Sequence, residues 1–143
     1  MGYKIFVDIN IWVDLLNSER LNHLDAINVI DMAEKGDCVA FVTESVLNTT
    51  SYLLRKDYSV PKLKGLFNHL LSFTELIPVT SIIYSKGLQT ALNDVEDAIL
   101  YTAALNANMD YFITTDLNDL KKLEVQELPV MTAKDFFNIA SHQ

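Results

Sequence analysis

The 143-residue sequence predicts a three-layer α/β/α fold, in which a small parallel sheet is flanked by helices. Short, continuous apolar runs, such as residues 5–7 and 39–42, are typical of strands that are buried on both faces of a parallel sheet. Segments with apolar residues at helical spacing alternate with these runs, which favours helices that cover both faces. Half of the residues are apolar, enough for the core of a single domain over residues 1–143.

The first half of the chain predicts a strand, a short helix, a long helix, a second strand and a third helix. The strands are apolar runs, and the helices have apolar residues three or four positions apart. Asn10 and Thr43 are predicted N-caps, because short polar side chains accept hydrogen bonds from the first free amides of a helix. Gly36 is a predicted C-cap. The predicted elements cover residues 5–7, 11–16, 22–35, 39–42 and 44–55.

The second half begins with a helix in which Pro61 occupies a favourable first-turn position. A brief strand-like stretch follows, then two helices, two further apolar strands and a closing helix. This order continues the alternation expected of a parallel sheet. The predicted elements cover residues 61–71, 76–79, 82–92, 95–106, 111–113, 128–131 and 134–140.

The sequence is acidic, with 11 Lys and Arg against 19 Asp and Glu and a formal net charge of −8. This charge argues against a protein that grips nucleic acid by bulk positive potential. The single cysteine excludes a disulfide framework and a Cys-based zinc site. No apolar stretch is long enough to cross a membrane, and Asp8 comes too early for the apolar region of a signal peptide. We therefore expect a cytoplasmic protein with no membrane partner.

Acidic residues follow several of the predicted strands. Asp8 comes directly after the first strand, Glu44 two residues after the second, and Asp116 three residues after the third apolar strand. Ligands of open α/β sheets bind outside the carboxyl ends of the strands, so these three acids are expected at one edge. Asp94 and Asp97 open the helix that precedes the third apolar strand. They join the other acids if that helix starts at the same edge.

Such a group of carboxylates predicts a specific chemistry. Carboxylates that lie close together repel one another, and they persist when a cation neutralises them. Oxygen ligands favour Mg²⁺ or Mn²⁺ over zinc or copper. Mg²⁺ held by a few acids keeps several waters, one of which could attack a phosphodiester, and two ions about 4 Å apart could stabilise the attacking and leaving oxygens. The predicted reaction is metal-assisted phosphodiester hydrolysis.

Each acid also has a simpler interpretation. Asp8 and Asp116 could hydrogen-bond a turn, and Glu44 and Asp94 suit the first turn of a helix because of the helix dipole. Asp97 lies on a helix that is expected to be mostly buried, where a carboxylate without a partner is costly, and this favours a functional role. The joint pattern is stronger than any single acid, since independent turns need not place acids at matching strand ends.

Four segments also match a known pattern in order and spacing. Residues 7–16 resemble an opening strand with a D-x-N-(I/V) turn, and residues 94–104 resemble a D-x-x-D-A helix. Residues 110–116 resemble a strand that ends in (I/V)-T-x-D, and residues 128–137 resemble a common C-terminal segment. With these motifs the chain resembles the PIN-domain family of nucleases, which includes the VapC-type toxins of bacterial toxin–antitoxin pairs.

The resemblance implies cleavage of single-stranded RNA that depends on Mg²⁺ or Mn²⁺. It assigns Asp8, Asp97 and Asp116 as metal-binding acids, with Asn10 and Thr114 as supporting polar groups. It also implies the role of a toxin that is neutralised by an antitoxin protein.

One position departs from the family pattern. The second family acid is normally a Glu in the helix after the second strand, and that position falls near Asn48 or Thr49. Glu44 lies one helical turn before Asn48, so both side chains could face the site. Either Glu44 substitutes, with Asn48 acting through a water, or the site is one carboxylate short.

Two other classes of function remain open at this point. A PIN-like domain without catalysis would act as an RNA- or protein-binding module, and the missing second acid favours this alternative. A receiver-like signalling domain fits the length and acidity, but it needs a phospho-acceptor Asp after a middle strand and a Lys at a late strand end, and neither is evident.

The apolar residues around residues 52–54 and 61–71 are expected in the core by default, but their number could exceed what a core of this size absorbs. Tyr52, Leu53 and Leu54 are followed closely by the Leu and Phe positions of the helix that begins near Pro61. Surplus apolar surface of this kind is typical of an interface, here one that would serve a homodimer or an antitoxin.

Overall fold

The structure of the protein is a computed structural model that describes residues 2–142. It confirms the predicted α/β/α class, with a five-stranded sheet in the order β3-β2-β1-β4-β5. Every neighbouring pair of strands is parallel. The strands are β1 (Lys4–Val7), β2 (Val39–Val42), β3 (Thr74–Leu76), β4 (Tyr111–Ile113) and β5 (Val130–Met131).

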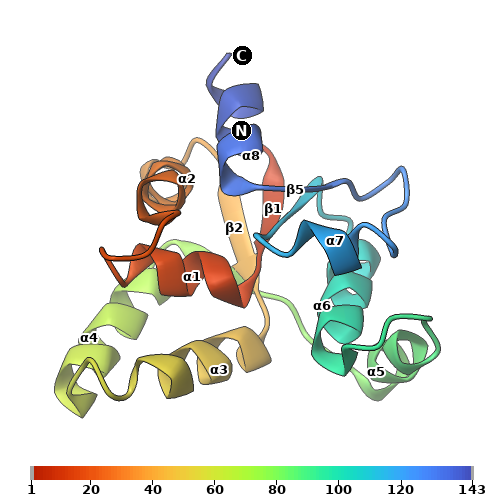
Figure 1. The fold of residues 1–143 in the computed structure, drawn as a ribbon, viewed down its shortest axis with the longest axis horizontal. Coiled ribbons are helices and arrows are strands. Elements are labelled where there is room, and N and C mark those ends of the chain that lie inside the picture. The colour runs from red at the N-terminus through yellow and green to blue at the C-terminus, as the bar shows by residue number, and fades with distance from the viewer. Residues whose placement is uncertain (1, 143) are drawn as a thin grey trace.

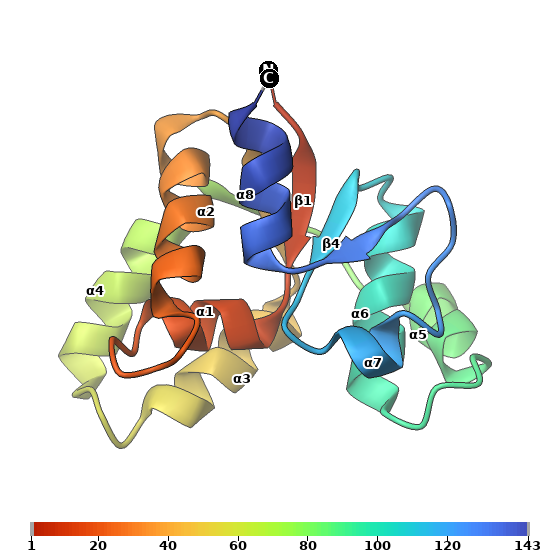
Figure 2. The ribbon, with the colours of Figure 1, turned by 45° about the horizontal axis from the view of Figure 1, so that its top comes forward.

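Helices cover both faces of this sheet. The helices α1, α2 and α8 lie on one side of it and α5, α6 and α7 on the other (Figures 1 and 2). The helices are α1 (Ile9–Leu15), α2 (His23–Lys35), α3 (Glu44–Leu54), α4 (Val60–Leu71), α5 (Ser81–Leu88), α6 (Val95–Asn106), α7 (Leu117–Leu120) and α8 (Ala133–Ser141).

The strand order explains where a ligand site can form. The chain builds outward from β1 through β2 to β3, then returns past β1 to form β4 and β5. The direction of winding therefore changes between β1 and β4, and a crevice opens at such a point beyond the carboxyl ends of the strands. Ile5 is in register with Tyr111 and Val7 with Ile113, so the residues that follow these two strands are neighbours.

The core of the sheet is built from large apolar side chains. Phe6 and Phe112 stack with ring centroids 5.0 Å apart, and both are fully buried. Trp12 is 1% exposed, and its indole Nε1 donates to the carbonyl of Val7 over 3.2 Å. This bond ties α1 to the end of β1, so the start of α1 is held against the sheet.

The helix caps agree with the sequence at two positions and differ at a third. The Thr43 hydroxyl accepts from the backbone of Val46 at the start of α3, and Gly36 ends α2 with φ of 87°. Asn10 was predicted to cap the first helix, but the cap is Asp8, whose carboxylate accepts from the Ile9 amide. The helix thus begins immediately after β1, and Asn10 lies within its first turn.

The strand predicted at residues 76–79 exists, but its bounds are wrong, because β3 covers Thr74–Leu76. Its last bond to β2 is donated by Ile77, and Pro78, which follows, has no amide with which to continue the ladder. The helix predicted to reach residue 92 ends at Leu88, and the short helix α7 was not predicted. Within residues 2–142 no helix combines the length and apolar character needed to cross a membrane.

Candidate active site

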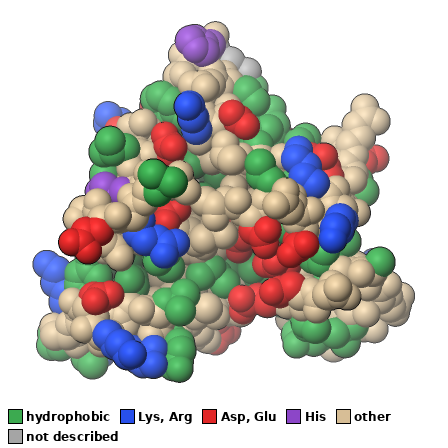
Figure 3. Space-filling model, in the orientation of Figure 1, with side chains coloured by type: hydrophobic (Ala, Val, Ile, Leu, Met, Phe, Trp, Pro, Cys, Tyr) green, Lys and Arg blue, Asp and Glu red, His purple; other side chains and the backbone are tan. Residues whose placement is uncertain are grey.

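A cleft of about 470 Å³ lies at the carboxyl ends of β1 and β4, at the point where the winding of the sheet changes direction. Acidic side chains gather in this hollow, between the side of α1 and α3 and the side of α6 and α7 (Figure 3). Five of the eight predicted site residues line the cleft: Asp8, Asn10, Asp94, Asp97 and Asp116. The other lining residues are Ile9, Val13, Asn17, Arg20, Thr49, Leu53, Leu54, Asp57 and Glu96.

Asp8 is the most deeply placed acid of the cleft, with only 3% of its surface exposed. Its Oδ1 accepts from the Ile9 amide over 2.8 Å, and its Oδ2 accepts from the Thr114 hydroxyl over 2.8 Å. Burial raises the pKa of Asp8 to about 6, although these two hydrogen bonds act in the opposite direction. The charges of Glu96 and Asp116 contribute to this raised pKa in the same direction as burial. The fold therefore holds this carboxylate where a negative charge is costly.

Thr114 is fully buried and connects the ends of β1 and β4. Besides donating to Asp8, its hydroxyl oxygen accepts from the Asp116 amide over 3.1 Å and from Asn10 Nδ2 over 3.4 Å. The side-chain Oδ1 of Asn10 accepts in turn from the Thr115 amide over 3.2 Å. One hydroxyl thus fixes the carboxylate of Asp8 and the turn that carries Asp116.

Asp94 and Asp97 enter the cleft from the start of α6. Asp94 caps this helix, because its Oδ1 accepts from the Asp97 amide over 3.0 Å. The pKa of Asp97 is raised to about 7, first by burial and then by the charges of Asp8, Asp94, Asp116 and Glu96. Acids from β1, α6 and the end of β4 therefore interact electrostatically in one cleft.

Glu96 is a cleft residue that the sequence analysis missed. Its Oε2 accepts from the Thr49 hydroxyl over 3.3 Å, a bond that joins α6 to α3. Thr49 lies where the resemblance expects the second family acid, so α3 contributes a hydroxyl there and α6 contributes the carboxylate. In the sequence, Glu96 has the position of an ordinary acid in the first turn of a helix, and no sequence pattern distinguishes it from such a residue.

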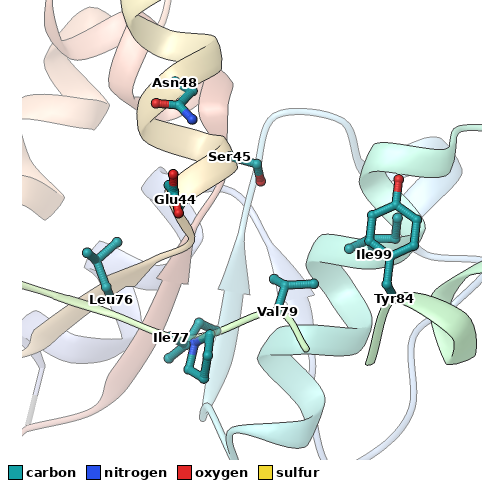
Figure 4. A pocket seen from close by; sticks show the side chains of 9 residues that line it. Glu44, Ser45, Asn48, Leu76, Ile77, Val79, Tyr84 and Ile99 are labelled. Carbon is teal, nitrogen blue, oxygen red and sulfur yellow. The ribbon is translucent and has the colours of Figure 1, made fainter. Parts of the chain in front are cut away.

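Glu44 and Asn48 do not line the acidic cleft. They line a separate cavity of about 640 Å³, together with Ser45, residues 76–79, Tyr84 and Ile99. Figure 4 shows Glu44, Ser45 and Asn48 projecting from α3 on one side of this cavity, with Tyr84 and Ile99 on the other. The one-turn spacing predicted that Glu44 and Asn48 share a face of α3, and they do, but that face is turned towards this cavity.

The donor chemistry of the cleft suits a hard divalent cation. Its acids supply only oxygen ligands, and their mutual repulsion and burial raise the pKa values of Asp8 and Asp97. A cation relieves both of these costs. Among the described residues, no group of three His, Cys, Asp or Glu side chains is spaced so that it could hold a metal ion. The carboxylates would therefore have to draw closer together around such an ion.

The fold and the cleft define a class: an α/β/α protein with an acidic cleft at the winding change of a five-stranded parallel sheet. The sequence model of the family described as PIN domain matches residues 4–118, which include all six acids that line the cleft, from Asp8 to Asp116. The chain belongs to the PIN domain family. The resemblance stated from its motifs is confirmed, and the receiver-like alternative is excluded.

Named relatives agree with this assignment. Ribonuclease VapC1 of Aquifex aeolicus (strain VF5) is 26% identical over 141 residues, which cover 93% of this chain and 92% of that protein. Among solved structures, VapC20 of Mycobacterium tuberculosis, a toxin that cleaves the sarcin–ricin loop, aligns with a TM-score of 0.67 at 18% identity. This alignment covers 86% of this chain and 97% of VapC20.

A second structural relative is VapBC2 of Rickettsia felis, solved with a DNA fragment from its promoter. It aligns with a TM-score of 0.64 at 15% identity, over 89% of this chain and 96% of that one. At such identities the two structures support the fold, and what they cleave or bind is a property of those proteins.

Proposed function

We propose that this protein is a metal-dependent endoribonuclease that hydrolyses phosphodiester bonds of single-stranded RNA, as the toxin of a toxin–antitoxin pair. The observation that carries the proposal is the meeting of Asp8, Asp97 and Asp116 in one cleft, with raised pKa values for the first two. Family membership supports nuclease chemistry, and the similarity to a VapC ribonuclease supports RNA as the substrate and an antitoxin as the partner.

Asp8, Asp97 and Asp116 are the residues that would hold Mg²⁺ or Mn²⁺. An ion held there supplies positive charge that lowers the pKa of water and offsets the charge that develops on the phosphate oxygens. Thr114 and Asn10 orient the Asp8 carboxylate and the turn before Asp116 through the hydrogen bonds described above.

We assign the role of the missing second acid to Glu96. In the proposed site it is the fourth carboxylate, delivered by α6 and held by Thr49 of α3. Its charge acts on both Asp8 and Asp97, whose pKa values it raises. Glu44 is assigned no catalytic role in this proposal, since it lines a different cavity.

The direct test is cleavage of a single-stranded RNA with Mn²⁺ or Mg²⁺ by wild type and by an Asp97→Asn variant. We expect the variant to lose at least about 100-fold in rate, because it removes a carboxylate in the cleft and keeps its shape. The matched control is Asp31→Asn, which changes a half-exposed acid that pairs with Lys35 on α2, outside the cleft. Equal rates for all three proteins would refute the site.

The alternative is a catalytically weakened PIN-like domain that binds RNA or protein, favoured by the absence of an acid at Asn48 and Thr49. The same experiment separates the two functions. Wild-type protein that binds RNA tightly but cleaves none with either metal would establish the binding module.

The proposed partners are an antitoxin and a second copy of the chain. Of the surplus apolar residues, Tyr52 is 61% and Leu53 49% exposed, whereas Leu54 is buried at 2%. Val60, the first residue of α4, is 64% exposed. Light scattering of wild type and a Tyr52→Glu variant tests the homodimer. A dimer mass for wild type and a lower mass for the variant would support it, and a monomer mass for both proteins would contradict it.

A further inference from the structure

Among the described residues that line the cleft, Arg20 is the only one with a positively charged side chain. Six of those residues are acidic: Asp8, Asp57, Asp94, Glu96, Asp97 and Asp116. A phosphodiester chain that enters this hollow meets negative charge on nearly every side, apart from any bound cation. Arg20 therefore occupies a position where its charge matters for the approach of a polyanion.

Arg20 is held in place by a buried acid. Its Nε donates to Oδ1 of Asp14 over 2.8 Å, and the Asp14 side chain is 3% exposed while that of Arg20 is 44% exposed. The terminal amino groups of Arg20 donate no hydrogen bond to any described residue. The guanidinium is thus anchored through Nε, and its two terminal amino groups remain available at the cleft.

The loop that carries Arg20 is also fixed. The Arg20 carbonyl accepts from the His23 amide, and its amide donates to the Asn17 carbonyl, each over 3.1 Å. The Tyr58 hydroxyl donates to the Leu16 carbonyl at the start of this loop. These bonds reduce the freedom of the side chain before any ligand binds, which favours binding.

Stability alone does not explain the ion pair between Asp14 and Arg20. Asp14 is buried, and its Oδ2 has no hydrogen-bond partner within the described residues. Replacing a buried ion pair by apolar residues is often neutral or stabilising. The Asp14 carboxylate orients Arg20 at the cleft. Its burial is therefore better explained by a ligand that Arg20 binds there.

We propose that Arg20 binds a backbone phosphate of the RNA that flanks the scissile phosphate, and that Asp14 is its positioning residue. This inference rests on the proposed function. Asp8 and Asp14 are six residues apart at the two ends of α1, about 9 Å along the helix axis at 1.5 Å per residue. Arg20 therefore contacts a neighbouring phosphate rather than the one at Asp8 and Asp97. Its planar pair of donors matches two phosphate oxygens.

The chain supplies a matched control, because it contains only two arginines, Arg20 and Arg55. Arg55 donates to the Tyr52 carbonyl, lies 3.7 Å over the Tyr52 ring, and does not line the cleft. Arg20→Gln and Arg55→Gln change the net charge equally. Only the first is expected to raise KM for single-stranded RNA, by about 10-fold with kcat changed less than about twofold, the effect of lost substrate positioning away from the reacting bond.

Binding gives a readout that does not need catalysis. In an Asp97→Asn background, fluorescence anisotropy with the same RNA is measured over a salt series. Arg20→Gln is expected to weaken binding about 10-fold and to flatten the slope of log K against log salt by about 0.7, the value for one contact with single-stranded nucleic acid. Binding and KM values for Arg20→Gln that equal those of Arg55→Gln overturn the inference. If wild type cleaves no RNA, the proposed function fails, while the binding comparison still tests Arg20.

Arg20→Gln leaves the Asp14 carboxylate buried without a partner, so the variant could lose stability for that reason alone. A double variant, Arg20→Gln with Asp14→Asn, removes both charges. It is expected to recover the unfolding temperature while RNA binding stays weak. Recovery of wild-type RNA binding by the double variant would assign the pair a purely structural role and overturn the inference.

Discussion

The buried carboxylate of Asp8 is expected to destabilise the folded protein at neutral pH when no cation is bound. Its pKa rises from 3.8 to about 6, because burial opposes its ionisation more strongly than the hydrogen bonds from Thr114 and Ile9 favour it. The folded state therefore binds this proton more tightly than the unfolded state. The destabilisation is absent below the unfolded pKa of 3.8, grows as the pH rises towards about 6, and is fully present above it.

The size of this effect follows from the shift. Each pKa unit corresponds to about 1.4 kcal/mol, so a shift of about two units amounts to ~3 kcal/mol above pH 6. Asp8→Asn removes the charge, and the amide oxygen can still accept from the Ile9 amide. The bond from the Thr114 hydroxyl is disturbed, at a cost of ~1 kcal/mol. The variant is thus expected to be more stable than wild type at pH 8 by ~2 kcal/mol.

Thermal unfolding in the presence of a chelator, at pH values from 4 to 8, measures this difference. At pH 8 the variant is expected to unfold about 6 °C above wild type, taking about 3 °C for each kcal/mol in a domain of this size. At pH 4 the gain disappears, since wild-type Asp8 is then protonated in the folded state. The reasoning would be refuted if the difference in unfolding temperature between the variant and wild type did not change with pH. It would also be refuted if the variant lost stability relative to wild type as the pH rose from 4 to 8. The same substitution is expected to abolish RNA cleavage, so stability and activity move in opposite directions.

Four further predictions concern the cation and the packing. Mn²⁺ is expected to raise the unfolding temperature of wild type at pH 8 but not that of Asp97→Asn, and equal shifts would count against the site. Gly87→Ala is expected to cost about 1–3 kcal/mol, because a Cβ there would lie 2.9 Å from Cγ1 of Ile99 across the α5–α6 contact. Gly65→Ala on α4 meets no atom within 4 Å and is expected to gain about 0.5–1 kcal/mol, so urea unfolding of this pair should give opposite signs. Tyr101→Phe removes a hydroxyl that bonds two backbone groups and is expected to cost about 1–3 kcal/mol in the same assay.

The fold was largely predictable because its signals are local. Apolar runs and helical spacing located all five strands to within a few residues, although Pro78 was wrongly included in one of them. The convergence of Asp8 and Asp116 followed from the rule that parallel strands end at one edge of the sheet. That rule needs only the carboxyl ends of the strands, and these were predicted correctly at Val7 for β1 and Ile113 for β4.

The rest of the site depends on which face of a helix turns inward. Both faces of α3 carry polar residues, so the sequence could not show that Thr49 faces the acidic cleft while Glu44 and Asn48 face another cavity. Glu96 was missed because first-turn acids are common without any function. Arg20 lies in a loop without periodicity, and its place in the cleft depends on the burial of Asp14 six residues earlier.

The hydrogen bond between Thr114 and Asp8 joins residues that are 106 positions apart in the chain. During synthesis, Asp8 therefore leaves the ribosome long before the strand that completes its surroundings. A growing chain that has not reached residue 111 lacks both β4, the neighbour of β1, and Thr114, which follows directly after β4. The hydrogen bond from Thr114 to Asp8 cannot form until most of the polypeptide has been made, so the acidic cleft is completed only late in each round of translation.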